Sequence, residues 1–294
     1  MSAVGDGRGA AADPVNSGLR AFTSPTPPWA PAGRTPPRSS RQLTASPARS
    51  CLSRRPGACA AATEFCLVEE PPPQLTAEHR TARDRVWDEL VGKNPALFDG
   101  PVVACTSLTQ TSPHELHLGW ARVTYRNFVL RRVPGAAALP SLFVDVLQPT
   151  DDGALLVAQM STATAHPGRW HLPGGSVDHP DAGWPLDTAA LRGNAARELL
   201  EELGVDIDPD ELTLWAVTRG DHGNIGVHFA APPQPATVPT DRLAAVAPAT
   251  IAVGQVPELE QVTFVHGPAD LKRLDGPHAD YLVPLVDRYA RILR

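Results

Sequence analysis

Apolar residues recur at two different spacings in the second half of this chain of 294 residues. One apolar position recurs every four residues, at Leu191, Ala195, Leu199 and Leu203, which predicts a helix over about 187–203 with a single buried face. Runs of strand length occur at 142–147, 154–159, 170–172, 212–217, 225–230 and 262–265, and a closing helix is predicted over 278–293. Strands on both sides of one central helix, with another helix at the end, predict a mixed α/β fold for residues 139–294.

A smaller group of elements precedes this region, over residues 75–138. A helix is predicted to begin near Thr76 and to end before Asn94-Pro95, because the residue before a proline disfavours helical backbone. Strands are predicted at 102–106 and 115–123, and a short helical segment at 125–131. A unit of about sixty residues buries too little surface to be a secure domain alone, so we expect this helix-and-hairpin unit to pack on the main domain.

Residues 1–74 differ in composition from the rest of the chain. Residues 1–66 hold eight Arg and no Lys against three acids, although the whole chain carries a net charge of −6. Twelve of the 32 Pro residues also precede residue 74, and such a mixture of Pro, Ser, Ala and Arg cannot bury enough apolar surface to order itself. We therefore expect a disordered tail over 1–74. It lacks the apolar core of a secretory signal, and it lacks the aromatic residues and Lys clusters typical of nucleic-acid binding.

The cysteine pattern and the hydropathy of the chain indicate the kind of cellular compartment in which the protein works. The four Cys form neither a CxxC pair nor a Cys/His array, which argues against a zinc site or a disulfide framework and favours a reducing compartment. No run approaches the roughly 20 apolar residues that span a bilayer. We expect a cytoplasmic protein that acts on a small molecule and has neither a membrane nor a nucleic-acid partner.

The strongest indication of chemistry is the run RELLEELG at residues 197–204. On a helix, the carboxylates of Glu198, Glu201 and Glu202 share one face, and like charges at this spacing destabilise a helix by roughly 0.2–0.5 kcal/mol per pair. A bound Mg²⁺ would offset this repulsion, because hard cations take carboxylate oxygens together with the phosphate oxygens of a substrate. The alternative is an acidic helix face exposed to solvent, which is common. The Pro-Gly-Gly turn at 173–175 favours the metal, since its glycines let the backbone approach a ligand closely.

This pattern resembles the signature of the Nudix hydrolase family, in which a glycine turn and a glutamate precede an Arg-Glu-apolar-any-Glu-Glu-any-Gly-apolar box. The second half of the signature is met in full over residues 197–205. In the first half, counting from Gly175 places the family's glutamate at Asp181, whereas counting back from Arg197 places it at Ala189. An insertion of about eight residues therefore separates the two halves of the box.

The resemblance implies a Nudix α/β/α sandwich with a mixed sheet, and a hydrolase that depends on Mg²⁺, with Mn²⁺ as the alternative ion. By the same resemblance, Glu198 and Glu202 would bind the metal directly, with Glu201 beside them and the carbonyl of Gly174 as a further ligand. Arg197 would hold a box carboxylate in position through bidentate hydrogen bonds, or else form a surface ion pair with Glu201.

Two further roles are left open by the resemblance. The ion-pair partner of Arg197 would be Asp181 or Asp187, in place of the family's glutamate. The general base would be Glu258, because many family members recruit an acid from a loop before a late strand; one of the last two box glutamates is the alternative. A loop acid exposed to solvent is the other interpretation of Glu258.

Four polar residues are candidates for substrate binding. His171 adjoins the Pro-Gly-Gly turn and could contact phosphate, although a histidine at a strand end is more often structural. Arg219 and Asp221 lie in a hairpin loop and could line a sugar or base pocket, although such loops favour Asp and Gly for turn geometry alone. Arg126 could bind a second phosphate, with exposure on the surface as the alternative.

Within the family, the leading region is similar to that of the animal uridine diphosphate glucose pyrophosphatases, in the helix with Trp87, the turn at 96–99 and the stretch at 123–128. This similarity implies a nucleoside diphosphate substrate, best a UDP-sugar cleaved to UMP and a sugar 1-phosphate. The alternatives are hydrolysis of ADP-ribose or of a nucleoside triphosphate, and nucleotide sensing by a non-catalytic domain. Many family members dimerise, so a homodimer is an expectation from the resemblance alone.

Overall fold

The computed structural model describes residues 58–60, 64–112, 115–252, 254 and 256–293, all of which fall in one compact unit, Gln42–Arg294. Its helices are α1 (Ala77–Lys93), α2 (Thr188–Leu203), α3 (Thr237–Ala252), α4 (Pro268–Leu271) and α5 (Leu282–Ile292), and its 3₁₀ helices are η1 (Tyr125–Arg132) and η2 (Pro209–Glu211). Its strands are β1 (Ala58–Ala60), β2 (Glu64–Glu69), β3 (Pro101–Ser112), β4 (Glu115–Thr124), β5 (Leu142–Leu147), β6 (Leu155–Met160), β7 (Trp170–His171), β8 (Gly174–Ser176), β9 (Thr213–Arg219), β10 (Ile225–Ala230) and β11 (Leu259–Val265).

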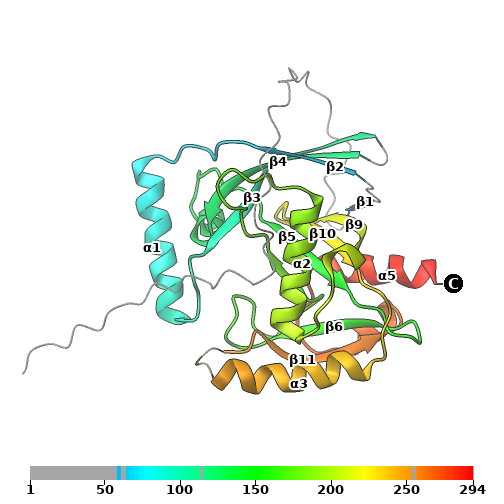
Figure 1. The fold of residues 1–294 in the computed structure, drawn as a ribbon. Helices are drawn as coiled ribbons and strands as arrows, with labels where there is room; N and C mark the ends of the chain where they lie inside the picture. Colours follow the sequence, from blue (N-terminus) through cyan, green and yellow to red (C-terminus); the bar gives the residue numbers. More distant parts are fainter. Residues whose placement is uncertain (1–57, 61–63, 113–114, 253, 255, 294) are drawn as a thin grey trace, which may run out of the picture. The chain divides into compact units, whose positions relative to one another are not determined.

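The strands form three sheets (Figure 1). The largest has the order β1-β9-β10-β5-β8 and is mixed, because β5 and β10 run parallel while the other neighbours run antiparallel. A second sheet, β11-β6-β7, is antiparallel throughout. The third sheet has the order β2-β4-β3, in which β3 and β4 form an antiparallel pair and β2 runs parallel to β4.

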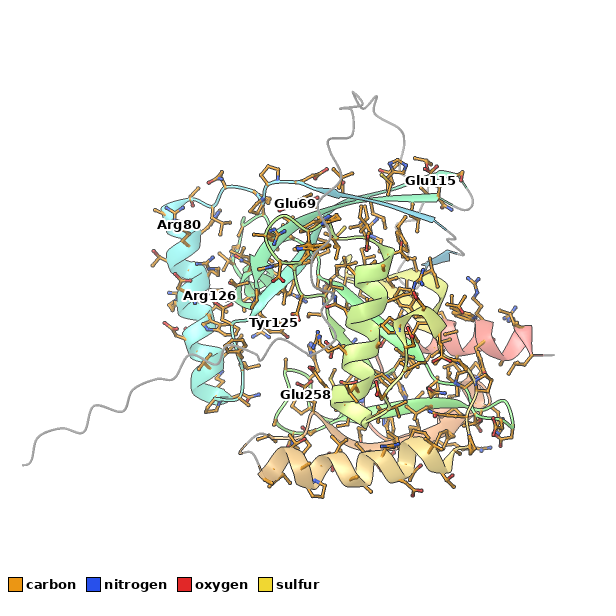
Figure 2. The ribbon with its side chains drawn as sticks, in the orientation of Figure 1. Glu69, Arg80, Glu115, Tyr125, Arg126 and Glu258 are labelled. Atoms are coloured by element: carbon orange, nitrogen blue, oxygen red, sulfur yellow. The ribbon has the colours of Figure 1, made fainter. Side chains whose placement is uncertain are left out.

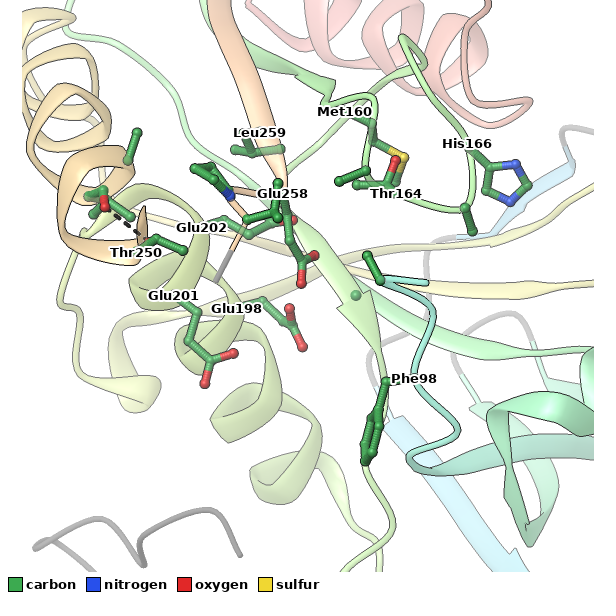
Figure 3. A pocket seen from close by; sticks show the side chains of 18 of the residues that line it. Phe98, Met160, Thr164, His166, Glu198, Glu201, Glu202, Thr250, Glu258 and Leu259 are labelled. Atoms are coloured by element: carbon green, nitrogen blue, oxygen red, sulfur yellow. Dashed lines mark hydrogen bonds between the residues drawn. The ribbon is translucent and has the colours of Figure 1, made fainter. Parts of the chain in front are cut away.

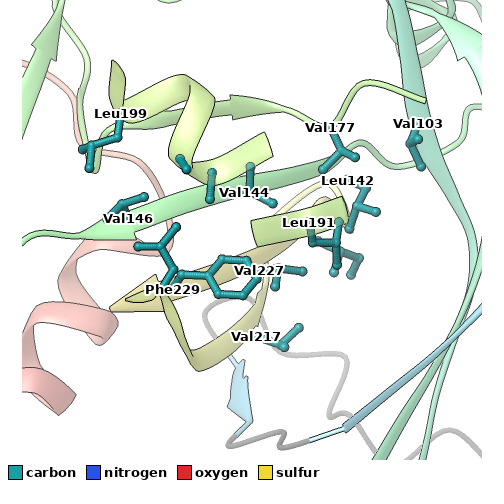
Figure 4. Close-up of a cluster of buried hydrophobic side chains, with 14 of the residues drawn as sticks. Val103, Leu142, Val144, Val146, Val177, Leu191, Leu199, Val217, Val227 and Phe229 are labelled. Atoms are coloured by element: carbon teal, nitrogen blue, oxygen red, sulfur yellow. The ribbon is translucent and has the colours of Figure 1, made fainter. Parts of the chain in front are cut away.

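Helices α2 and α5 cover the two faces of the large sheet. Successive side chains of a strand point to opposite faces, and along β5 Val144 and Val146 pack with the apolar face of α2 (Figure 4). Phe143 and Leu147, on the other face, pack with α5. The result is an α/β/α sandwich around a mixed sheet, as the sequence predicted.

The leading helix and hairpin pack on this sandwich. Strands β3 and β4 contribute Val103, Leu118 and Trp120 to the same hydrophobic cluster that holds the apolar face of α2. Helix α1 buries Trp87, whose ring meets the ring of Tyr125 at 6.3 Å between centroids. The shared cluster explains why this small unit is stable beside the main domain, while a domain boundary near residue 139 stays a prediction.

Part of the segment that the composition assigned to a disordered tail forms strands. Residues 58–60 and 64–69, which the sequence placed in the tail, are strands β1 and β2. Strand β2 pairs with β4 over its whole length, and its alternating Phe65 and Leu67 pack against the main hydrophobic cluster. Pairing with a preformed hairpin therefore orders a segment whose composition alone would not fold it. Residues 1–57 lie outside the described residues.

Helix α3 is the longest element that the sequence did not predict. It contains Pro239 and Pro248, and a proline inside a helical pattern is ordinarily read as a break. Pro239 lies in the first turn, where a missing N–H loses no helical hydrogen bond. Among the helices of the described residues, none combines the length and apolar character needed to cross a lipid bilayer.

Candidate active site

Helix α2 carries the acidic run and has well-defined ends. The Asp187 carboxylate caps its first turn by accepting a hydrogen bond from the Ala190 N–H at 2.8 Å. Gly204 ends the helix in the left-handed conformation, at φ 65°, which glycine adopts at little cost. These bounds agree with the helix predicted over about 187–203.

The Pro-Gly-Gly bend is held against strand β5, next to α2. The Pro173 carbonyl accepts a hydrogen bond from the Val146 N–H at 2.8 Å, and Gly174 lies opposite Asp145 in the sheet. A Cβ atom added to Gly174, which has φ 150°, would lie 2.1 Å from the Val144 carbonyl oxygen. Only glycine therefore fits at this position of the bend.

Glu198 and Glu202 meet the bend directly. The Glu202 carboxylate accepts a hydrogen bond from the Gly174 N–H at 2.8 Å. A Cβ atom added to Gly175 would lie 2.7 Å from Oε2 of Glu198, so the absence of a side chain there makes room for this carboxylate. The two box glutamates and the glycine turn are thus in contact, as the sequence predicted.

These groups line a cavity of about 850 Å³. Its walls come from six parts of the chain: the α1–β3 segment at 96–98, Tyr125 at the start of η1, residues 160–166 at the end of β6 and in the loop after it, the bend at 174–176, α2, and α3 with the residues that follow it up to Leu259. Figure 3 shows Glu198, Glu202 and Glu258 converging between Thr250 of α3 and Phe98. Cavities of this size hold substrates of nucleotide dimensions.

Burial and mutual repulsion change the proton affinity of the acids. Burial, reinforced by neighbouring acids and opposed by Arg197, raises the pKa of Glu198 to about 7. Burial and the charge of Glu198 raise the pKa of Glu202 well above its ordinary value. Carboxylates held in this way gain from a nearby positive charge, which would let them ionise.

Glu201 is oriented differently from its neighbours. Its side chain is 57% exposed and pairs with Arg197 at 2.7 Å, four residues before it on α2. It still borders the cavity, but its carboxylate is engaged at the surface of the helix. The surface ion pair considered for Arg197 therefore exists, and it coexists with a second contact.

Arg197 also binds Glu198 and an acid that the sequence did not indicate. Its guanidinium lies 2.7 Å from Glu198 and 3.1 Å from Asp178. Neither Asp181 nor Asp187 takes the place of the family's glutamate, since Asp187 is used as the helix cap. The inserted segment brings Asp178, three residues after the glycine turn, to this position, and sequence counting could not anticipate the path of the insertion.

Glu258 lies where the sequence placed it, at the start of β11 and on the wall of the cavity. Loss of surrounding water and the charge of Glu201 raise the pKa of its carboxylate. Glu258 is exposed to solvent, which also agrees with the alternative of a loop acid at the surface. Its location agrees with that expected for a general base, and this role stays a prediction.

Two candidates for substrate binding are used elsewhere in the fold. Arg126 pairs with Asp99 and, at 3.5 Å, with Asp84 of α1, outside the cavity (Figure 2). His171 is buried behind the bend, where loss of water lowers its pKa to about 4. Neither His171 nor Arg126 lines the cavity, so the structure does not bring either of them to the acids for contact with phosphate.

Arg219 and Asp221 are also separate from the acids. Arg219 borders a different hollow of about 210 Å³ beside β3. The Asp221 N–H donates a hydrogen bond to the Asp280 carboxylate at 2.6 Å, which makes Asp221 part of a turn. The hairpin that carries them extends away from the acidic cavity, and only the tertiary path of β9 and β10 could show this.

The cavity is suited to a hard divalent cation. Within the described ranges, no three His, Cys, Asp or Glu side chains lie close enough together to hold an ion by themselves. Mg²⁺ typically uses one or two carboxylates and completes its octahedron with water and substrate phosphate. Glu198 and Glu202 supply two buried carboxylates, and they fit this mode of binding.

Comparison with protein families shows that residues 142–282 match the NUDIX domain family. This range begins with β5 and ends at the start of α5, so it contains the bend, α2 and the acids. A comparison with curated protein sequences found no match. The resemblance of residues 197–205 to the Nudix signature agrees with this match over residues 142–282, while the similarity to uridine diphosphate glucose pyrophosphatases stays a prediction.

Several solved structures are similar to part of this chain. The MutT protein from Methanosarcina mazei Go1 is 20% identical, with a TM-score of 0.37 over 53% of this chain and 96% of that one. The E. coli ORF135 protein is 22% identical, with a TM-score of 0.33 over 52% and 92% of the two chains. A NUDIX hydrolase from Nitrosomonas europaea is 15% identical, with a TM-score of 0.33 over 52% and 89%.

Proposed function

We propose that this chain, whose residues 142–282 match the NUDIX domain family, hydrolyses the diphosphate bond of a nucleoside diphosphate sugar with Mg²⁺ or Mn²⁺. The substrate we favour is a UDP-sugar, cleaved to UMP and a sugar 1-phosphate. The observation that carries the proposal is the meeting of Glu198 and Glu202 with the glycine bend on the wall of a cavity of about 850 Å³.

The charge of the cavity supports a requirement for metal. The charged residues on its wall are Glu198, Glu201, Glu202 and Glu258, and no Lys or Arg is among the lining residues that the structure describes. A free diphosphate would meet only like charges there, and unscreened repulsion of this kind is costly in a partly enclosed site. A bound divalent cation would neutralise the phosphoryl oxygens and lower the pKa of a coordinated water.

The residues of the chain then have separate tasks in this proposal. Glu198 and Glu202 hold the cation, and the Gly174 carbonyl is an additional candidate ligand. Glu258 accepts a proton from the attacking water, a task favoured by its raised pKa, as the oxygen of that water bonds to phosphorus and the bridging P–O bond breaks. Arg197 holds Glu198 and Glu201 by one hydrogen bond each and so orients the acidic run.

The test is an assay of the purified chain with Mg²⁺ against UDP-sugars, ADP-ribose and nucleoside triphosphates. We expect hydrolysis of a UDP-sugar, and Glu202→Gln is expected to lower kcat by about a hundredfold or more, because it removes a ligand charge but keeps an acceptor for the Gly174 N–H. Glu260→Gln is the matched control, since Glu260 lies on the same strand as the cavity wall but does not line it.

Three results would change the proposal. Faster turnover of ADP-ribose or of a triphosphate would replace the UDP-sugar and keep the reaction type. Binding without hydrolysis of any member of the panel would favour a sensing domain. Equal loss of activity in Glu202→Gln and Glu260→Gln would remove the assignment of the acids.

A further inference from the structure

Phe98 is an exposed aromatic side chain on a fixed piece of backbone. Its side chain is 75% exposed, and it borders the acidic cavity. Single exposed apolar residues are common on protein surfaces and need no explanation by themselves. The position of Phe98 is informative because the segment that carries it is tied down on both sides.

Asn94 and Asp99 provide these ties. The Asn94 side-chain carbonyl accepts from the Ala96 N–H at 3.1 Å, and its amide donates to the Ala163 and Thr164 carbonyls at 2.9 and 3.2 Å. The Asp99 carboxylate accepts from the Arg126 backbone N–H at 2.7 Å. The α1–β3 segment is therefore joined to the β6–β7 loop, and together they make one wall of the cavity. The backbone that carries Phe98 is therefore fixed beside the cavity before any ligand arrives.

Helix α3 supplies the wall on the other side of the acids. Leu243, Val246, Ala247 and Thr250 are spaced three and four residues apart, are each partly buried, and all line the cavity. Figure 3 shows the acids between Thr250 and Phe98. If a diphosphate binds at the acids, the part of the cavity near Phe98 is left free for one of the two groups attached to that diphosphate.

The chemistry of the Phe98 wall selects among substituents. Leu97, Phe98 and Tyr125 form an apolar surface, and polar groups come from Thr164 and His166 on the adjoining loop. A charged phosphate would find no Lys or Arg lining this wall among the described residues; the charges of Arg131, Arg132 and Arg169 reach His166, but these residues do not line the cavity. A nucleobase has an uncharged planar face with polar edges, which is the combination that such a wall offers.

We propose that Phe98 is the stacking face of a nucleobase subsite, which makes it a specificity-determining residue of the cavity. The inference rests on the proposed function, because the diphosphate must lie on the acids for the base to reach Phe98. It adds that the planar base binds on the wall built by the leading helix-and-hairpin unit, opposite α3. The sugar and its leaving phosphate are then directed toward α3.

The experiment compares UDP-glucose with its 5,6-dihydrouridine analogue, which has the same charge but a saturated, non-planar base. For the full chain with Mg²⁺, we expect a KM about tenfold lower for UDP-glucose than for the analogue. Phe98→Ala is expected to raise the KM of UDP-glucose about tenfold, to leave that of the analogue within about twofold, and to leave kcat unchanged, while Phe98→Trp restores the preference. Trp184→Ala is the control, because Trp184 is 54% exposed but does not line the cavity.

The outcomes separate this inference from the proposed function. If hydrolysis persists and Phe98→Ala changes the KM of both substrates equally, or of neither, the nucleobase subsite is refuted and the hydrolase is retained. If no substrate is hydrolysed, calorimetric titration with UDP-glucose and with ADP-ribose in Mg²⁺ decides. Weaker binding by Phe98→Ala than by Trp184→Ala would support the subsite, and unchanged or undetectable binding would overturn it.

Discussion

Gly175 determines whether the buried carboxylate of Glu198 can reach the Pro-Gly-Gly bend. Its neighbour in space is the end of the Glu198 side chain, at 2.7 Å from a Cβ atom placed on Gly175. The far end of a flexible side chain can move aside, so an added methyl group is expected to cost little stability. It would, however, displace a carboxylate whose position is essential for the proposed metal site.

Gly175→Ala should therefore separate activity from stability. We expect hydrolysis to fall by at least about tenfold, because a metal ligand moved by a fraction of an ångström no longer meets the cation, while the melting temperature changes little. Gly193→Ala is the matched control: Gly193 lies on α2 with no atom within 4 Å of an added Cβ, and alanine is favoured in helices by about 1 kcal/mol over glycine. Assays of turnover and of thermal unfolding on both variants test this. Full activity in Gly175→Ala would show that Glu198 tolerates displacement.

Individual site residues were predictable only where a short-range rule placed them. Glu198 and Glu202 follow from helical periodicity and from the glycine turn, and both were identified from the sequence. Asp178 and Phe98 were not, because the path of the insertion and of the α1–β3 segment depends on contacts distant in sequence, such as that between Asn94 and Thr164. Arg126 failed as a ligand for the same reason, since its partner Asp99 lies 27 residues earlier in the chain.

At the scale of elements, α2 depends on the cap at its start. The Asp187 carboxylate accepts one of the backbone N–H groups that a helix leaves unpaired in its first turn, and its negative charge is favourable at the positive end of the helix. The same helix presents Glu198 and Glu202 near its other end, two or more turns from the cap. Loss of the cap should thus lower the stability of the fold more than it lowers the rate of hydrolysis.

Asp187→Ala is expected to lower the free energy of unfolding by about 1 kcal/mol and to leave KM and kcat nearly unchanged. Asp187→Ser should keep most of the stability, because its hydroxyl can accept the same hydrogen bond. Chemical denaturation followed by circular dichroism gives the stability difference, and the hydrolysis assay gives the activity. A large loss of activity in both variants at unchanged stability would restore Asp187 as a partner of the box arginine.

Elements with strong periodicity were predicted closely, and those set by tertiary pairing were not. The strands expected at 142–147 and 225–230 coincide with β5 and β10, since both lie in the buried centre of the large sheet. Strand β2 exists because β4 offers an edge for it to pair with. Helix α3 was not predicted because Pro239 and Pro248 interrupt its sequence, and the face with Leu243 and Val246 is only partly buried.

At the scale of the whole molecule, the cavity exists because distant parts of the chain meet around α2. The leading unit, the large sheet, the second sheet and α3 each supply a wall. Folding therefore brings Glu198 and Glu202 together beside Glu258 and removes water from around Glu198 and Glu202, which costs free energy. This cost links the stability of the entire fold to pH and to divalent cations.

The sign of the linkage follows from the pKa of Glu198, which the folded state raises from its ordinary value to about 7. Between about pH 4.5 and pH 7, the folded chain keeps a proton that the unfolded chain has released, so stability conferred at low pH is lost as the pH rises through this window. A displacement of this size corresponds to at most about 3 kcal/mol. Glu202, whose pKa is also raised, acts in the same direction.

Without metal, the wild-type chain is therefore expected to lose stability from about pH 5 to about pH 7.5 relative to Glu198→Gln, which removes the titrating group. Mg²⁺ at millimolar concentration should reduce this difference, because a cation that binds the ionised carboxylates stabilises only the folded state. Urea denaturation at several pH values, with chelator and then with Mg²⁺, measures both effects without reference to catalysis. If the free energies of unfolding of the wild type and Glu198→Gln change in parallel with pH in chelator, ionisation of Glu198 does not destabilise the fold. If Mg²⁺ leaves the difference in stability between the wild type and Glu198→Gln unchanged, the cation does not bind at these carboxylates.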